Sequence, residues 1–362
     1  MKVLRRQFAA YGGFALLAGA SPSIAACGAA GEQVGAHDGG RDAVNAYQGV
    51  DASSVDGNVG CKSGEPGVTC LAATDETHLI AALTVDDENL YWIAQGPATS
   101  AAVMMAPRAG GAAITLADIT DDGFWQSLAS DGRHVYWRDS GDGGAGSIMQ
   151  IPVTGGTPVT VARATSPTCI ASDGSSVYWT QQGGGVVEAP IAGGTPTTLY
   201  AGGRGGPLVV DSTDVYFVDG LVLKVGKHGG SAATVWDPSP AIPTPGSGCR
   251  QLAISAGTLV VMYGPATDAP LHPQLGSMPV TGTTTRPTVL VTGSMPSAVV
   301  AGVSEIFWLG LTNEVQVNQT PLSGGPTTTL ATPNAPYAVD IALASDGTVY
   351  WATDVQIESR AP

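Results

Sequence analysis

The sequence predicts an all-β fold made of repeated four-stranded units. Three observations carry this prediction: a composition poor in charge but rich in glycine and proline, an aromatic residue that recurs at an even spacing, and a glycine-rich turn in most repeats. Charged residues make up 12% of the 362 residues, while glycine numbers 50 and proline 25. Such a composition favours short strands joined by tight turns over helices. With 43% hydrophobic residues, the chain can also bury a large core.

One repeating unit is visible from residue 68 onward. It consists of a short apolar strand, a Ser-Asp-Gly turn, a strand with an aromatic pair, a third strand, a Gly-Gly-Thr-Pro turn and a fourth strand. In the clearest copy these elements occupy residues 128–129, 130–132, 135–137, 148–152, 155–158 and 159–162. Neighbouring residues on a strand point to opposite faces of a sheet. We therefore expect Tyr136 and Trp137 to pack toward the two adjacent units.

The second position of the aromatic pair recurs seven times, at intervals of 38 to 47 residues. The seven positions are Trp92, Trp137, Trp179, Phe217, Val261, Trp308 and Trp351. A four-stranded unit of this length is typical of a β-propeller blade, because such a sheet buries its two apolar faces only between neighbouring blades. The sequence therefore predicts a seven-bladed β-propeller of four-stranded antiparallel blades.

The two ends of the repeat region complement each other. The last repeat stops at Pro362, before a fourth strand can form, whereas residues 68–72 resemble a fourth strand with no repeat before it. Pairing residues 68–72 with the last repeat closes the ring and removes both open sheet edges. We therefore expect the propeller to cover residues 68–362, with its N-terminal strand closing the last blade.

The first residues have the plan of an export signal. Lys2, Arg5 and Arg6 precede a moderately apolar run and several small residues, which predicts a secretory signal peptide over residues 1–26. The arginine pair fits a twin-arginine signal, although Leu4 stands where a polar residue is usual. Tat and Sec export therefore both stay open.

A lipid anchor is predicted directly after the signal. Residues 24–27 (Ile-Ala-Ala-Cys) resemble a lipobox, which implies cleavage before Cys27 and acylation of its thiol; ordinary cleavage after Ala20 is the alternative. The residue after the cysteine is not aspartate, which favours the outer membrane. Residues 27–67 otherwise contain hardly an apolar pair and predict a disordered tether. We therefore expect a cell-envelope protein, anchored in the outer membrane.

Four further cysteines suggest disulfides, because an exported protein folds in an oxidising compartment. Four cysteines allow three pairings. Cys61 and Cys70 are the closest in sequence, and we expect this pair. Cys169 and Cys249 each lead into a repeat, and they either pair with each other or stay free.

The segment 177–180 (Val-Tyr-Trp-Thr) and its counterparts resemble the YWTD-type and TolB-like propellers, and the chain as a whole is similar to the β-propeller repeat lipoproteins of bacteria. The resemblance covers residues 68–362 and concerns architecture. The fourth motif residue varies between repeats, and the YWTD propellers of receptors have six blades. The resemblance therefore implies a propeller and no particular ligand.

The sequence contains no catalytic centre of a familiar type. The stretches expected to line the channel contain no His, Asp or Glu; they are 81–83, 128–129, 170–171, 208–210, 252–254, 299–301 and 342–344. A metal-dependent lyase or lactonase would need such ligands there. The five histidines form no constellation, so we expect no metal and no cofactor. Acidic clusters such as Asp139 with Asp142 indicate polar loops, with calcium as the alternative.

Loop lengths point to a binding surface. Turns after the first and third strands are short and alike, whereas loops after the second and fourth strands vary and emerge on the opposite face. We call these the turn face and the variable face. Variation confined to one face is typical of binding surfaces. The candidate ligand-binding residues on the variable face are Arg250, Gln251, Tyr263, His272, Trp125 and Tyr337.

These features favour a non-enzymatic, monomeric lipoprotein whose propeller binds an envelope protein, peptide or glycan. The formal net charge of −15 argues against a nucleic-acid partner. Two alternatives stay open. One is an enzyme, a lyase or a glycan-active protein, with a loop-built site near Arg250 and Asp340 at the channel mouth. The other is a passive structural module whose loops merely differ in length.

Overall fold

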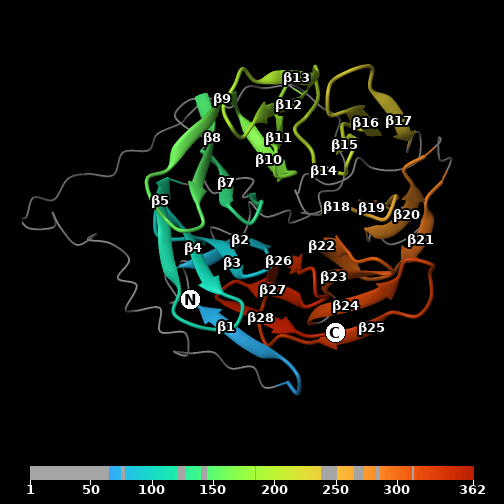
Figure 1. Cartoon of the computed structure of the whole chain (residues 1–362). Coiled ribbons are helices and arrows are strands. Elements are labelled where there is room, and N and C mark those ends of the chain that lie inside the picture. Colours follow the sequence, from blue (N-terminus) through green and yellow to red (C-terminus); the bar gives the residue numbers. More distant parts are fainter. Residues whose placement is uncertain are drawn as a thin grey trace, which may run out of the picture. The chain divides into compact units, whose positions relative to one another are not determined.

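The computed structural model describes residues 65–74, 78–120, 127–139, 145–183, 185–237, 251–264, 273–281, 286–311 and 314–362. Over these ranges the chain forms 28 strands and no helix, arranged as seven four-stranded antiparallel sheets around an axis (Figure 1). The described part accordingly contains no helix that could span a membrane. The seven-bladed prediction is confirmed.

Each blade runs outward from the strand nearest the axis. Blade 1 contains β2 (Leu79–Val85), β3 (Asn89–Gln95), β4 (Ser100–Pro107) and β5 (Ile114–Thr120). Blade 2 contains β6 (Leu128–Ser130), β7 (His134–Asp139), β8 (Ala145–Pro152) and β9 (Val159–Thr165). Blade 3 contains β10 (Pro167–Ser172), β11 (Ser176–Gln181), β12 (Gly185–Pro190) and β13 (Thr197–Tyr200). Blade 4 contains β14 (Leu208–Val210), β15 (Asp214–Val218), β16 (Val222–Gly226) and β17 (Ala233–Trp236).

The remaining blades follow the same order. Blade 5 contains β18 (Leu252–Ser255), β19 (Thr258–Tyr263), β20 (Gln274–Pro279) and β21 (Thr288–Val291). Blade 6 contains β22 (Met295–Ala301), β23 (Glu305–Leu311), β24 (Val315–Pro321) and β25 (Thr328–Ala331). Blade 7 contains β26 (Ala338–Leu343), β27 (Val349–Thr353), β28 (Gln356–Arg360) and, as its outermost strand, β1 (Thr69–Ala73).

The ring closes between the last and the first blade. Each inner strand contacts the inner strand of the next blade, and β26 contacts β2 to complete the circle. On the outside, β1 pairs antiparallel with β28, with Thr69 opposite Ser359 and Ala73 opposite Gln356. The expected N-terminal closing strand is therefore present, one residue further along the chain than predicted.

The aromatic pairs form the cores between blades. Tyr136 and Trp137 are almost completely buried, and they belong to different apolar clusters. Each cluster joins the first member of one pair to the second member of the next pair. The seven combinations are Tyr91 with Trp137, Tyr136 with Trp179, Tyr178 with Phe217, Tyr216 with Val261, Val260 with Trp308, Phe307 with Trp351, and Tyr350 with Trp92. The last combination joins blade 7 to blade 1, so side-chain packing also closes the ring.

The expectation that the inner strands lack acidic residues was wrong for blade 7. The strand β26 begins earlier than expected, because a bulge between Ala338 and Asp340 lengthens it. Asp340 is 3% exposed. Its Oδ2 accepts a hydrogen bond of 2.8 Å from the N–H of Leu83 in blade 1, and its Oδ1 accepts one from the N–H of Ile341. This carboxylate therefore links the last blade to the first at the inner wall.

The turns after the inner strands contain a repeated interaction that the sequence analysis missed. In blade 2, Asp131 Oδ1 accepts hydrogen bonds from the N–H groups of Arg133 (2.8 Å) and His134 (2.7 Å), while its Oδ2 accepts one from the Tyr136 hydroxyl (2.8 Å). We call this arrangement the Asp–Tyr clamp. The other clamps are Asp86 with Tyr91, Asp173 with Tyr178, and Asp211 with Tyr216, at 2.7, 3.0 and 2.9 Å. Each clamp ties the turn to a ring buried between blades.

The clamp shifts the pKa values of both of its side chains. Burial alone would raise the pKa of Asp131, but the hydrogen bonds from Tyr136 and the turn N–H groups outweigh it and lower this pKa. Burial, and then the hydrogen bond to the carboxylate, raises the pKa of Tyr136. An ionised Asp and a neutral Tyr are therefore the favoured pair in the folded protein.

The two partners of the clamp are lost together. Blade 5 has Ser255 and Val260 at the two positions, and blade 6 has Gly302 and Phe307. Blade 7 keeps an Asp and a Tyr, but Arg108 of blade 1 joins them: it donates to Asp346 Oδ2 (2.5 Å) and to the Tyr350 hydroxyl (2.8 Å). The exceptions support a paired role for the two residues.

Removing β1 tests the ring closure. A chain lacking residues 1–74 loses the partner of β28 and exposes an unpaired strand edge, so we expect it to aggregate or to unfold at clearly lower temperature. A chain lacking residues 1–64 keeps β1 and serves as the control. The measurement is thermal unfolding combined with size-exclusion chromatography. Equal stability and equal monomer content of the two truncated chains would contradict the closure by β1.

A double-mutant cycle tests the clamp. We expect Asp131→Ala and Tyr136→Phe each to lower the free energy of unfolding and to be coupled by about 2 kcal/mol, because the bond between them is partly buried and charge-assisted. The measurement is urea unfolding at neutral pH. A coupling energy near zero would show that the two side chains act independently.

The pH dependence of the same variants follows from the lowered pKa of Asp131. The stabilisation is present above the ordinary pKa of an aspartate, about 4, and is lost as the pH falls through the lower folded-state pKa. We therefore expect the difference in stability between the wild type and Asp131→Ala to shrink on acidification below about pH 4. A difference that is constant with pH would contradict an ionised Asp131 in the clamp.

Candidate functional site

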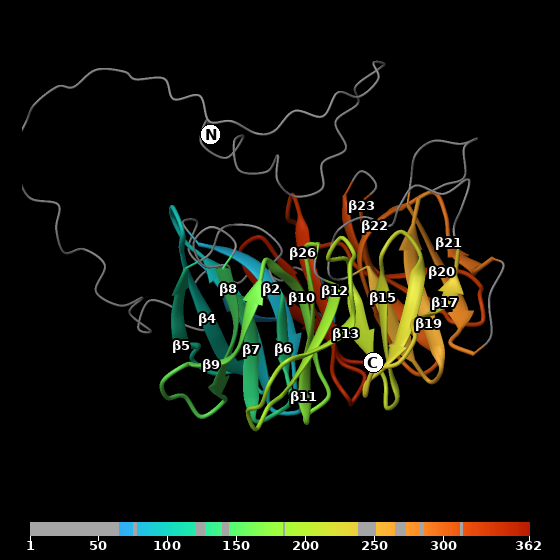
Figure 2. The ribbon, with the colours of Figure 1, turned by 90° about the horizontal axis from the view of Figure 1, so that it is seen from above.

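The strand bounds show that loop length varies much more on one face than on the other. On the turn face, the connections after the inner strands are similar, as in residues 86–88, 131–133 and 173–175. On the variable face, the connections range from residue 166 alone to residues 237–251. Figure 2 shows the ring from its side, with the strands running between these two faces. The blades therefore form a uniform support for unequal loops.

Three of the six predicted binding residues lie outside the described residues; they are Arg250, His272 and Trp125. The same holds for Cys27, for Cys61 of the expected disulfide and for Cys249. The lipid anchor and the disulfide partners of Cys70 and Cys169 therefore stay predictions.

Two predicted binding residues lie at the variable-face end of blade 5, and both are integrated into the blade. Tyr263 is 5% exposed, and its ring packs edge-on against Trp236 of blade 4 at 5.2 Å. Burial raises the pKa of its hydroxyl, against the opposing effect of Arg286. Gln251 is half-buried, and its carbonyl accepts a hydrogen bond of 2.9 Å from the N–H of Met262. The Tyr263 ring thus serves the core between blades 4 and 5.

The variable-face ends of blades 6 and 7 expose large apolar side chains. Met295 at the start of β22 is 41% exposed, and Leu311 at the end of β23 is 36% exposed. The two residues lie directly opposite each other in the sheet. Tyr337, which is 44% exposed, directly precedes β26, the inner strand that contacts β22 and β23. We call these three residues the apolar patch.

Only one residue of the patch was expected from the sequence. Tyr337 was predicted because it is an aromatic residue in a loop of the variable face. Met295 and Leu311 were missed, because their exposure depends on where β22 and β23 end relative to the buried part of the blade. In both strands the patch residue is the terminal residue, next to the buried positions of the strand.

Among the described residues, the inner wall offers few side chains that could act in catalysis or bind a metal. No group of three or more His, Cys, Asp or Glu side chains is placed there, or elsewhere in the described part, to hold a metal. The buried carboxylate of Asp340 accepts backbone N–H bonds with both of its oxygens. These bonds assign Asp340 to the closure of the ring.

Comparison with known proteins identifies the architecture. No family model matches the chain, and no curated protein matches its sequence. Several solved propellers are similar in structure. YCF48 bound to a D1 peptide is 10% identical, with a TM-score of 0.60 over 82% of this chain and 97% of that chain. Streptogramin B lyase is 15% identical, with a TM-score of 0.58 over 81% of this chain and 96% of that chain.

The β-propeller domain of the trilobed protease from Pyrococcus furiosus is a third similar structure, 6% identical, with a TM-score of 0.59 over 79% of this chain and 96% of that chain. The fold is a β-propeller. At these identities the likeness shows the fold alone, and the similar structures include both enzymes and non-enzymatic propellers. The resemblance to bacterial repeat lipoproteins stays a prediction.

Proposed function

We propose that this chain is an exported, lipid-anchored propeller that binds a protein or peptide of the cell envelope through its variable face. The observation that carries the proposal is the apolar patch of Met295, Leu311 and Tyr337. Exposed aromatic and methionine side chains are enriched at protein interfaces. Two of the three lie side by side in one sheet, so they offer a continuous contact for an apolar side chain of a partner.

The position of the patch supports binding over a passive role. It lies on the face where loop length varies, while the turn face and the cores between blades repeat with little change. A rigid ring with unequal loops on one face holds a contact surface in place at little entropic cost on binding. YCF48, a propeller of similar structure, was solved with a D1 peptide bound, which illustrates this use of the fold.

The patch also favours a polypeptide over a glycan. A glycan presents many hydroxyl groups, which need polar partners once they are removed from water. Met295 and Leu311 have no hydrogen-bonding groups on their side chains apart from a weak thioether acceptor. An apolar segment of a protein is the better match.

The structure gives less support to the alternative of an enzyme with a loop-built site at the channel mouth. That reading needed Asp340 together with Arg250. The carboxylate of Asp340 is buried and holds the N–H of Leu83 across the ring closure, so it is committed to the inner wall. Binding is therefore the better supported of the two functions.

Substitution of the patch tests the proposal. We expect the double variant Leu311→Ser with Tyr337→Ser to lose about tenfold or more of its partner recovery from a cross-linked envelope extract, because buried apolar anchors dominate interface energies. Val303→Ser is the matched control, since Val303 is 83% exposed and lies on the turn face. Quantitative mass spectrometry measures the recovery. Equal recovery with all three proteins would remove the patch as the binding surface.

A second experiment tests the anchor. We expect the wild type to fractionate with membranes and to carry an acylated N-terminal cysteine, and the Cys27→Ser variant to be released, because stable anchoring depends on the acyl chains. Intact-protein mass spectrometry after membrane fractionation measures both properties. Membrane association of Cys27→Ser at the wild-type level would contradict the lipid anchor.

A further inference from the structure

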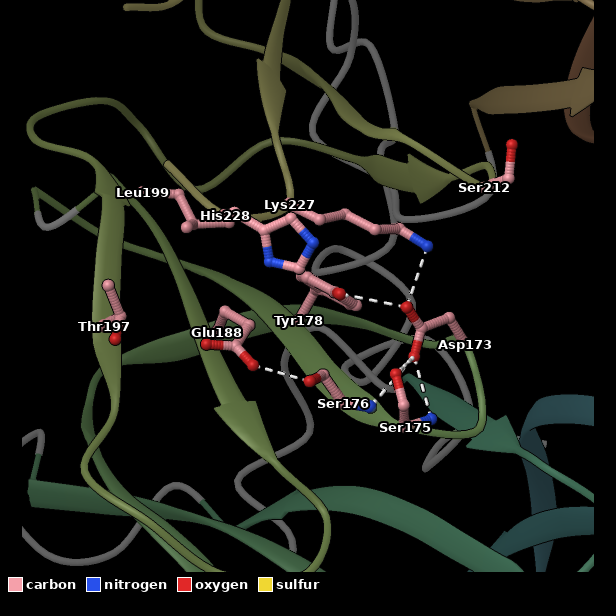
Figure 3. Close-up of a pocket in the computed structure, with 10 residues that line it drawn as sticks. All are labelled: Asp173, Ser175, Ser176, Tyr178, Glu188, Thr197, Leu199, Ser212, Lys227 and His228. Atoms are coloured by element: carbon pink, nitrogen blue, oxygen red, sulfur yellow. Dashed lines mark hydrogen bonds and ion pairs between the residues drawn. The ribbon is translucent and has the colours of Figure 1, made fainter. Parts of the chain in front are cut away.

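A cleft opens on the turn face between blades 3 and 4, away from the apolar patch. Its volume is about 380 Å³, which lies within the range of small-molecule sites. Blade 3 supplies most of the wall, and the turns of blade 4 supply the rest (Figure 3). The lining residues are Asp173, Ser175, Ser176, Tyr178, Glu188, Thr197, Leu199, Ser212, Lys227 and His228.

Beside this cleft, a lysine occupies a position that is apolar in most blades. The residue that follows the third strand is apolar in four blades and packs into the core shared with the preceding blade; these residues are Val153, Ile191, Val280 and Leu322. In blade 4 the equivalent residue is Lys227. Its side chain lies over the Tyr178 ring at 5.6 Å, and its Nζ reaches Asp173 Oδ2 at 2.7 Å. The lysine is thus directed to the clamp of blade 3, and the cleft lies beside it.

The two carboxylates of the cleft differ in their charge balance. Asp173 is neutralised by Lys227; burial alone would raise the pKa of this carboxyl, but the lysine and the turn N–H groups lower it well below the ordinary value. Glu188 Oε1 accepts a hydrogen bond of 2.5 Å from the Ser176 hydroxyl. Among the described residues no cation lies within ion-pair distance of Glu188. One uncompensated negative charge therefore faces the cleft.

We propose that this cleft binds a primary ammonium group, of the kind that ends a lysine side chain or a polyamine. An ammonium has three N–H donors, which match the Glu188 carboxylate and the hydroxyl oxygens of Ser176 and Thr197. Leu199 offers an apolar contact for the methylene chain that carries the ammonium. The net charge of −15 raises the local concentration of cations around the protein. This site goes beyond the proposed function and lies on the other face.

Binding of small amines to the full chain tests the site. The probes are putrescine and Nα-acetyl-lysine amide, with 1-butanol as an uncharged control, titrated by calorimetry at about pH 8, where free imidazoles are neutral. We expect both amines to bind and 1-butanol not to bind. Tighter binding of the lysine amide assigns the site to a protein side chain, and tighter binding of putrescine assigns it to a free polyamine. Binding of 1-butanol at the level of the amines, or no binding of either amine at millimolar concentration, would overturn the proposal.

Two variants change the charge of the cleft in opposite directions. We expect Glu188→Gln to weaken amine binding about five- to tenfold, because the shape is kept and the charge is removed. Lys227→Met should strengthen binding, because it leaves Asp173 uncompensated, and aliphatic residues at this position are tolerated in four other blades. Thermal unfolding confirms that each variant is folded.

Glu305→Gln is the matched control, since Glu305 also accepts a hydrogen bond from a serine, Ser304, at 3.2 Å, but lies in blade 6. We expect this variant to bind the amines like the wild type. Equal loss of affinity in Glu188→Gln and Glu305→Gln would indicate a general effect of net charge and would contradict a site at Glu188.

Discussion

The Asp–Tyr clamp connects the turn geometry within a blade to the packing between neighbouring blades. Within a blade, the carboxylate of a residue such as Asp131 holds the backbone of the turn that leads into the second strand. Between blades, the tyrosine it holds is part of the apolar core shared with the next blade. The turn geometry and the packing of neighbouring blades are therefore one cooperative unit, which explains why blades 5 and 6 lack both residues at once.

The closure between blades 7 and 1 uses three contacts at different distances from the axis. Asp340 of blade 7 accepts a hydrogen bond from Leu83 of blade 1 at the inner wall, and Arg108 of blade 1 joins Asp346 and Tyr350 of blade 7 at the turn face. On the outside, β1, which directly precedes the first strand of blade 1 in the chain, completes blade 7 by pairing with β28. Closure makes the propeller rigid, because an open ring would leave the first and last blades without a packing neighbour on one side. This rigidity allows the variable face to hold the apolar patch of blades 6 and 7 in a fixed arrangement.

Much of the fold could be predicted from the sequence, because the spacing of Trp92 and its counterparts indicates the length and the number of the blades. The closing strand followed from the same count. The clamp left a trace in four repeats as Asp and Tyr five residues apart, but its meaning depends on the turn bringing both to one carboxylate. Asp340 was expected in a loop at the channel mouth and not in the inner strand, because a bulge extends β26. The cleft could not be foreseen, because its walls come from two neighbouring blades, between which Lys227 reaches Asp173.

The two faces thus have separate tasks: the variable face offers apolar contact, and the turn face carries the clamps and the polar cleft. The turn geometry and the packing between blades both depend on the clamp, and hydrogen exchange of the native protein measures its effect on the turns. We expect slower exchange for the turn amides of residues 131–136 and 173–178 than for those of 255–260 and 302–307, which have no clamp. Equal exchange rates in clamped and unclamped turns would contradict this effect of the clamp.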